Sequence, residues 1–313
     1  MRMHQVAAII LLLTGFTVAA VIGVPALSAQ QTPSAPTPPA QLPAGRGGGG
    51  GGLSAKAPHL VASVWTASST VARTKLRHEW VEVPLGAARL RSWVEYPDGE
   101  ARAPVVLVLQ HEPGLDDWMR SVADQLASEG FIAVAPDLFS GFGPGRGHFD
   151  SFPAPDVAMR QAGSRLTANE ALRRALVAAE FGLKLPRASG TIGVLGVGSG
   201  GALAFRFAAE APTVHAAVVF YGAAPDESVL RRVKAPVIGF YGDDDEAVTE
   251  NVGATAETMK GLGKAFEVHR YEGATHAFLT IQFEGRNTPA VEHAWPRATA
   301  FLKQHLLNET RKP

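Results

Sequence analysis

The sequence of 313 residues contains no cysteine and has no excess charge of either sign. The missing thiol excludes disulfides, thiolate metal sites, a cysteine nucleophile and a lipidated N-terminal cysteine. The 29 lysine and arginine residues equal the 29 aspartate and glutamate residues in number. No basic field is therefore available to hold nucleic acid. Apolar residues make up 46% of the chain, which is ample for a large core, whereas 33 glycines and 22 prolines indicate that part of the chain lies outside it.

Residues 1–29 are typical of a secretory signal peptide. Arg2 precedes a stretch without charge, residues 6–29, which ends in small residues. We expect cleavage after Ala29. The alternative is an uncleaved membrane anchor, because the stretch is long enough to span a bilayer. In both cases the rest of the chain is expected to be exported, to the periplasm or out of the cell.

Residues 30–58 have the composition of a disordered linker, with 6 prolines and 7 glycines that include six consecutive glycines at 47–52. Such a segment has little apolar area to offset its chain entropy. The remaining residues, 59–313, suit one α/β domain in length.

Within residues 59–313, buried strands alternate with amphipathic helices. Residues 80–84 and 89–96 alternate polar and apolar side chains, which predicts half-buried strands near a sheet edge. Continuous apolar runs predict fully buried strands. The further predicted strands are 104–109, 131–136, 191–195, 215–221, 236–241 and 266–271. Amphipathic helices are predicted at 118–129, 168–185, 201–211, 251–262 and 289–307. This order predicts an α/β fold with a mainly parallel sheet and helices on both faces. Chemistry in such folds collects at the carboxyl ends of the strands.

Four of the predicted strands end in suggestive residues. His111 and Glu112 follow the strand at 104–109, and a glycine-rich turn, 196–201, follows the strand at 191–195. Asp245 and His276 follow the last two strands. A tight turn, then an acid, then a histidine is the chain order of the α/β-hydrolase triad. We predict that Asp245 orients His276, and that His276 is a general base. The alternatives are a solvated acidic turn and a surface histidine.

These motifs resemble the dienelactone hydrolase family, especially its exported bacterial members. The resemblance extends from about Arg77 to Leu307 and rests on the runs 114–126, 135–138, 193–205, 239–245 and 271–278. It implies an α/β-hydrolase fold with little cap, which opens esters or lactones through a cysteine or serine nucleophile and needs no cofactor.

The turn departs from the family pattern at its centre. A small residue is required two positions before and after the nucleophile, and Gly196 and Gly200 meet this requirement only if position 198 is the nucleophile. Position 198 is glycine, so the nucleophile position is predicted to be vacant. Ser199 then supplies its backbone N–H to an oxyanion hole or, as the alternative, acts as a displaced nucleophile.

A second departure follows the strand at 104–109. The resemblance implies a glutamate near the nucleophile. His111 takes that place in an alignment without a gap, and Glu112 takes it if one gap is allowed. Water is one replacement for the missing side chain, with His276 or His111 as general base, since a glycine would make room for it. We predict that His111, Glu112 and Tyr221 line the substrate site.

Other interpretations explain less. Residues 196–201 match G-x-G-x-x-G, but the acidic residue that a dinucleotide site requires at the end of the next strand is missing. The histidines and acids lack the spacing of a known zinc site, so no metal is predicted. The glycine- and phenylalanine-rich segment 139–165 is either a mobile lid over an apolar pocket or a surface loop.

Two functions remain. The first is an exported hydrolase of a small ester or lactone, without cofactor, without nucleic acid, and on a membrane only if the N-terminal segment is retained. The second is a catalytically silent relative that binds a small ligand or a protein partner in the former active-site cleft.

Overall fold

The computed structural model describes residues 61–282 and 287–307. The predicted signal peptide and the predicted linker lie outside these residues. Among the helices of the described ranges, none combines the length and the apolar character that a bilayer crossing requires.

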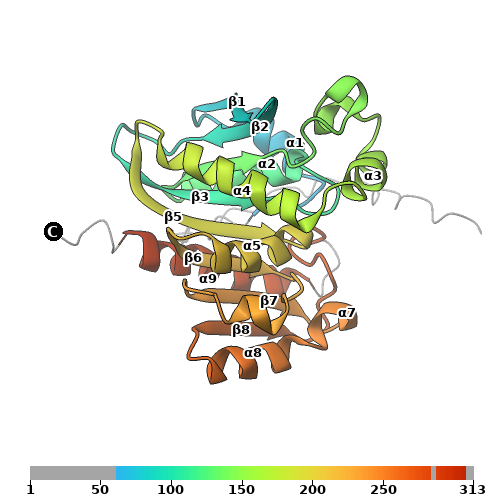
Figure 1. Ribbon diagram of the computed structural model, residues 1–313, viewed down its shortest axis with the longest axis vertical. Helices are drawn as coiled ribbons and strands as arrows, with labels where there is room; N and C mark the ends of the chain where they lie inside the picture. The colour runs from blue at the N-terminus through green and yellow to red at the C-terminus, as the bar shows by residue number, and fades with distance from the viewer. Residues whose placement is uncertain (1–60, 283–286, 308–313) are drawn as a thin grey trace, which may run out of the picture. The chain divides into compact units, whose positions relative to one another are not determined.

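An eight-stranded sheet forms the centre of the domain (Figure 1). Its spatial order is β1-β2-β4-β3-β5-β6-β7-β8. The strands are β1 (His78–Leu85), β2 (Ala88–Glu95), β3 (Ala103–Leu109), β4 (Ile132–Pro136), β5 (Ala188–Val197), β6 (Val214–Phe220), β7 (Val237–Gly242) and β8 (Phe266–Tyr271). The pairs β1–β2 and β2–β4 are antiparallel, and every other pair is parallel. The predicted fold class is therefore confirmed, with the two alternating strands at one edge.

Strand β3 shows why the central strands read as continuous apolar runs. Val105, Leu107 and Leu109 point into the core on one face of the sheet, while Val106 and Val108 point into the core on the other. Successive side chains of a strand alternate between faces, so a strand covered on both sides needs an apolar residue at every position.

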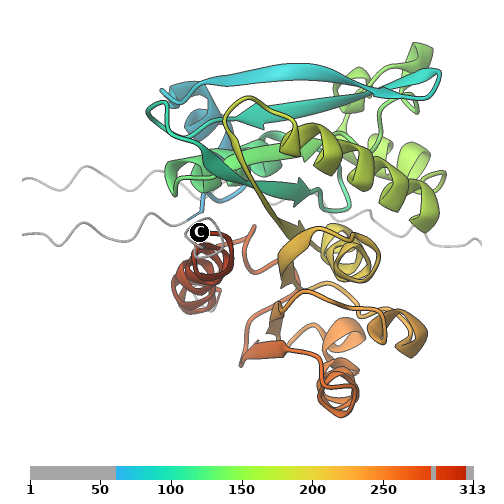
Figure 2. The same cartoon turned by 60° about the vertical axis from the view of Figure 1, so that its left-hand side comes forward.

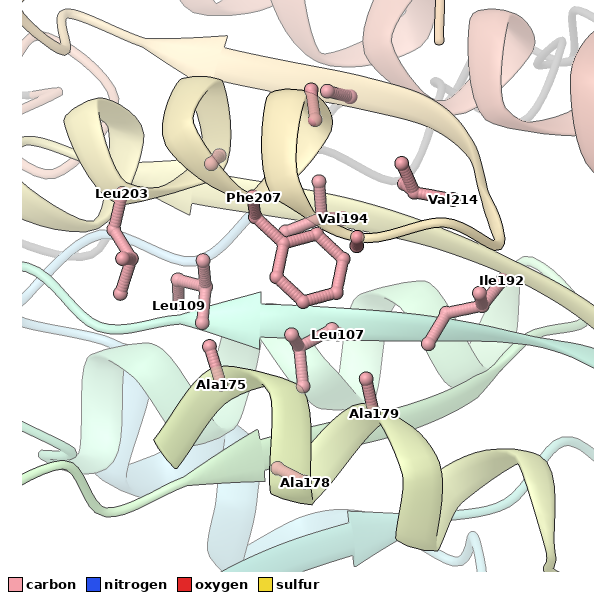
Figure 3. Packing of buried hydrophobic residues seen from close by; sticks show 14 of the residues in the cluster. Leu107, Leu109, Ala175, Ala178, Ala179, Ile192, Val194, Leu203, Phe207 and Val214 are labelled. Atoms are coloured by element: carbon pink, nitrogen blue, oxygen red, sulfur yellow. The ribbon is translucent and has the colours of Figure 1, made fainter. Parts of the chain in front are cut away.

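Helices cover both faces of the sheet (Figures 1 and 2). One face carries α4 (Ala168–Leu183), α5 (Ser199–Glu210) and α8 (Val252–Gly261), and the other carries α2 (Asp117–Ser128) and α9 (Thr288–Leu307). The core between the sheet and α4, α5 and α8 is the first core, and the core on the side of α2 and α9 is the second core. Figure 3 shows the first core, where small residues of α4 lie against the leucines of β3 and Phe207 of α5. Alanines on the sheet-facing side of α4 bring the helix close to the strands.

The segment 139–166 contains short helical turns rather than an open loop. They are η1 (Pro144–Arg146), η2 (Phe149–Ser151), α3 (Pro155–Ala158) and a π-helical turn, η3 (Met159–Gly163). Phe139 and Phe152 pack with Ala158 and Ala162 in a small core of their own. The sequence did not predict these turns, nor the short helices α1 (Ala67–Arg73), α6 (Glu227–Leu230) and α7 (Glu246–Thr249).

Candidate active site

The turn between β5 and α5 is bent sharply at Gly198, which has φ +56° and ψ −119°. Residues other than glycine rarely adopt this backbone conformation. Its neighbours leave no space either, because a Cβ at Gly196 would overlap the carbonyl of Gly200, and one at Gly200 would overlap the carbonyl of Leu109. Close packing of α5 on β3 and β5 therefore requires both glycines, and Gly198 is the apex of the turn.

The carboxylate of Glu112 fills the space beside Gly198. A Cβ at position 198 would lie 2.5 Å from Oε1 of Glu112 and 2.8 Å from its Cδ. The backbone N–H of Ser199 donates a hydrogen bond to the same Oε1 at 2.6 Å. Side-chain atoms of Glu112 therefore stand where the side chain of a larger residue 198 would begin, and the water predicted beside the glycine stays a prediction. Of the two registers that the sequence left open, it is Glu112 that reaches the turn.

His111 lies beside the turn but is engaged elsewhere. Its Nε2 is 3.1 Å from Oδ2 of Asp116, and its ring centroid is 5.1 Å from that of Trp118. Asp116 is the N-cap of α2 and accepts the backbone N–H of Met119 at 2.9 Å. The His111 side chain is thus fixed to the start of α2.

Asp245 and His276 are brought together from the ends of β7 and β8. Nδ1 of His276 lies 2.6 Å from Oδ2 of Asp245. Asp245 is the N-cap of α7, yet its side chain makes no capping hydrogen bond, so the carboxylate is available to the imidazole. Because an ionised carboxylate only accepts hydrogen bonds, Nδ1–H is the donor, and Nε2 remains for proton transfer. The Asp245 side chain is 7% exposed and that of His276 is 44% exposed, so the acid is buried and the base faces outwards.

Tyr221, which follows β6, packs against His276. Its ring centroid is 5.0 Å from that of His276, and its hydroxyl is 3.2 Å from Oγ1 of Thr280. Burial raises the pKa of the Tyr221 hydroxyl, and the negative charges of Glu112 and Asp245 add to the increase against the opposing Thr280 hydrogen bond. Its φ of +38° is strained for a tyrosine. The Tyr221 side chain is buried, so its ring packs against His276 from the protein interior.

Asn287 holds the loop that carries His276, a role that no motif in the sequence indicates. Its Oδ1 accepts the backbone N–H of Thr275 at 3.1 Å, and its Nδ2 donates to the carbonyl of Ile281 at 2.7 Å. The residue is fully buried. It is a positioning residue, because it fixes both sides of the loop without facing the surface.

A cavity of about 800 Å³ opens beside the turn. Its polar lining residues include Gln110, His111, Glu112, Ser199, Arg206 and Asp226. Its walls are mainly apolar, from Leu138, Phe139, Met159, Leu166, Ala168, Ala171, Ala202, Leu203, Ala223, Ala224, Pro225 and Val229. Phe139, Met159 and Gly163 of the segment 139–165 thus line this apolar cavity, whereas the predicted mobility of the segment stays a prediction. In the part of the chain that the structure describes, no group of three or more histidines and acids is placed to hold a metal ion.

Comparison with known sequences points to one family. A sequence model described as the Dienelactone hydrolase family matches residues 90–306. The carboxymethylenebutenolidase of Pseudomonas sp. (strain P51) is 30% identical over 226 residues, which cover 70% of this chain and 92% of that protein. A putative carboxymethylenebutenolidase of Saccharolobus solfataricus is 25% identical over 252 residues, covering 69% of this chain and 95% of that protein.

Solved structures show the same fold. A putative dienelactone hydrolase from Klebsiella pneumoniae superposes with a TM-score of 0.64 at 20% identity, covering 74% of this chain and 100% of that one. The dienelactone hydrolase-like promiscuous phosphotriesterase P91, from metagenomic libraries, gives a TM-score of 0.63 at 20% identity, covering 74% and 99%.

Proposed function

Because this chain belongs to the dienelactone hydrolase family, we propose that it hydrolyses a small ester or lactone. The observation that carries the proposal is the 2.6 Å hydrogen bond between Asp245 and His276 at the carboxyl edge of the sheet. The names of the relatives, carboxymethylenebutenolidases, agree with a lactone or ester as substrate. A mainly apolar cavity of about 800 Å³ suits the acyl part of such a molecule.

His276 is the proton-transfer group of the proposed reaction. Asp245 holds Nδ1, which leaves Nε2 to give a proton to the leaving oxygen and to take one from the attacking water. The buried carboxylate also stabilises the protonated imidazole. The chemistry uses no cofactor or metal ion.

We also propose that the protein is exported, with Gly198 at the position of the family's nucleophile. Export rests on the uncharged stretch at residues 6–29 and its small-residue end. Edman sequencing of the protein purified from its native host would test cleavage after Ala29. An N-terminus at Met1 would favour the retained anchor.

Hydrolysis of 4-nitrophenyl acetate and of a small unsaturated lactone tests the proposed function. We expect turnover by the wild type and at least a hundred-fold loss of kcat in His276→Ala. Ser199→Ala should retain activity, because the backbone N–H remains. Loss of activity in Ser199→Ala would instead make its hydroxyl the displaced nucleophile, and absence of turnover in the wild type would refute the proposal.

A second candidate is a silent relative that binds a small ligand or a partner at the same place. Two observations favour it: residue 198 has no side chain, and the Ser199 N–H is already occupied by Glu112. This candidate predicts that small lactones bind to the wild type in calorimetry without being consumed.

A further inference from the structure

Glu112 occupies the volume that a side chain at position 198 would take. Its Oε1 and Cδ lie 2.5 and 2.8 Å from the position of a Cβ there, and its Oε2 is closer still. A carboxyl oxygen therefore stands next to the apex of the turn, where the reactive atom of a longer residue at 198 would be. The carboxylate comes from the loop after β3, and the turn follows β5, which is the neighbour of β3 in the sheet.

Two features hold this carboxylate in place. The backbone N–H of Ser199 binds Oε1 at 2.6 Å, at the N-terminus of α5, whose dipole favours a negative charge. The loop itself is closed by the hydrogen bond from Gly114 N–H to the His111 carbonyl at 3.1 Å and by the contact between His111 and Asp116. Among the described residues, the hydrogen bond of the Glu112 side chain is made by Oε1. Glu112 also lines the cavity beside the turn.

Tyr221 relates to both the proton-transfer pair and Glu112. Its ring contacts His276, and the negative charges of Glu112 and Asp245 both raise the pKa of its hydroxyl. Strand order accounts for this arrangement. Tyr221 follows β6, which lies between the strand that leads to Gly198 and the strand that leads to Asp245.

We propose that Glu112 is the nucleophile, in place of the missing side chain at 198. This inference rests on the proposed ester or lactone hydrolysis. A carboxyl oxygen of Glu112 attacks the carbonyl carbon of the substrate, and a tetrahedral intermediate forms. The bond to the leaving oxygen then breaks, protonated His276 gives that oxygen a proton, and the acyl group remains on Glu112 as a mixed anhydride.

The second half of the reaction restores the enzyme. His276, now neutral, takes a proton from water while the water oxygen attacks the acyl carbon of the anhydride. The bond between that carbon and the Glu112 oxygen breaks. The acid product leaves, Glu112 is again a carboxylate, and His276 is again protonated. One ester and one water are consumed, and one acid and one alcohol are formed.

A trapping experiment on the full chain tests this assignment. The wild type, Glu112→Gln, His276→Ala and a control, Glu250→Gln, are mixed with 4-nitrophenyl acetate and quenched with hydroxylamine, and the peptides are analysed by mass spectrometry. Glu250 is exposed and follows α7, so its substitution makes the same chemical change away from the cavity. Circular dichroism confirms that each variant is folded.

We expect a burst of one 4-nitrophenol per chain and a hydroxamate on the peptide that contains Glu112. The hydroxamate should increase in His276→Ala, where water is no longer activated. Glu112→Gln should lose the burst, the hydroxamate and at least a hundred-fold in kcat, and Glu250→Gln should stay within two-fold of the wild type.

Three results would overturn one or both claims. Turnover by Glu112→Gln within three-fold of the wild type refutes the nucleophile and leaves the proposed hydrolysis intact. Loss of turnover in Glu112→Gln without any burst or hydroxamate in the wild type or His276→Ala also refutes it, since Glu112 then acts as a base on water. A single acylation of Glu112 without turnover supports the nucleophile and refutes hydrolysis, whereas neither acylation nor turnover refutes both.

Discussion

At Gly198 a single added carbon should disturb the site more than at Gly253 of α8. A residue other than glycine at φ +56° costs of the order of 1–3 kcal/mol, and a Cβ there would push the flexible end of Glu112 away. We expect Gly198→Ala to lower the free energy of unfolding by about 1–3 kcal/mol and kcat at least ten-fold, because Ser199 N–H loses its partner. Denaturant unfolding and ester hydrolysis measure the two effects.

Gly253 provides the matched control for this substitution. It lies in α8, and a Cβ there meets nothing within 4 Å. Gly253→Ala should therefore be neutral or slightly stabilising, since alanine favours helix. Unchanged activity in Gly198→Ala would mean that the place of the Glu112 carboxylate is immaterial.

Asp245 and Asp243 offer a comparison between two acids of the same turn. Asp245 is buried and bound to His276, whereas Asp243 pairs with Arg270 at the surface at 2.7 Å. In Asp245→Asn the amide no longer enforces the Nδ1–H tautomer, so kcat should fall by about 10²–10⁴. Asp243→Asn should change kcat less than two-fold. Equal effects of the two substitutions on ester hydrolysis would contradict the role of Asp245.

The sequence predicted the positions of some of these residues better than others. Asp245 and His276 follow buried strands, and the carboxyl ends of parallel strands meet at one edge, so their proximity could be expected. The place of Glu112 could not, because one residue of register separates it from His111 and both types suit a site. Contacts across the sheet decide between them: the Ser199 amide binds Glu112, and Asp116 binds His111.

At the scale of elements, the long periodic segments were predictable and the short ones were not. Each predicted strand and helix has a counterpart within a few residues of its predicted bounds. Helix α1 has seven residues, too few for a clear period, and depends on packing of Ala67 against the core near α2. Asn287 likewise gave no signal, because its hydrogen bonds join two parts of a loop that only the fold brings together.

Segment 139–166 should behave as a unit that can loosen while the sheet stays folded. Phe152 is 8% exposed and packs in the small core that includes Phe139, a wall of the cavity. Phe152→Ala should raise KM several-fold, leave kcat within two-fold, and increase protease cleavage between residues 141 and 151, because it removes contacts of this core only. Steady-state kinetics and limited proteolysis are the measurements.

Phe301 gives the corresponding control on the opposite face of the sheet. It lies on α9 and packs against the second core. Phe301→Ala should lower global stability and leave KM unchanged. A similar rise of KM in both variants would show that general destabilisation, and not segment 139–166, determines substrate binding.

At the scale of the whole molecule, strand order gathers the site. Glu112, Gly198, Tyr221, Asp245 and His276 follow β3, β5, β6, β7 and β8, which are consecutive neighbours in the sheet. The Glu112 nucleophile that we propose would come from the strand end next to that of Gly198. Because the strands are fixed by two apolar cores, such a replacement leaves the fold unchanged.

A buried acid far from this edge should control how stability depends on pH. Glu95 is 1% exposed, accepts the indole N–H of Trp93 at 2.9 Å, and lies beside Asp124 of α2. Burial raises the pKa of Glu95 to about 8, and the Asp124 charge adds to the increase, although the Trp93 hydrogen bond opposes it. An unfolded glutamate titrates near 4.5.

Between these two pKa values the folded protein retains a proton that the unfolded chain has lost. The free energy of unfolding should therefore fall as pH rises from about 5 to about 8, by at most about 1.4 kcal/mol per pH unit. Glu95→Gln cannot ionise and keeps an acceptor for Trp93, so its stability relative to the wild type should increase steadily over this range. Glu100 is exposed, so the free energy of unfolding of Glu100→Gln should depend on pH as that of the wild type does. Urea unfolding at pH 5, 6.5 and 8 distinguishes the cases: parallel pH profiles for Glu95→Gln and the wild type would mean that Glu95 is already ionised in the folded state.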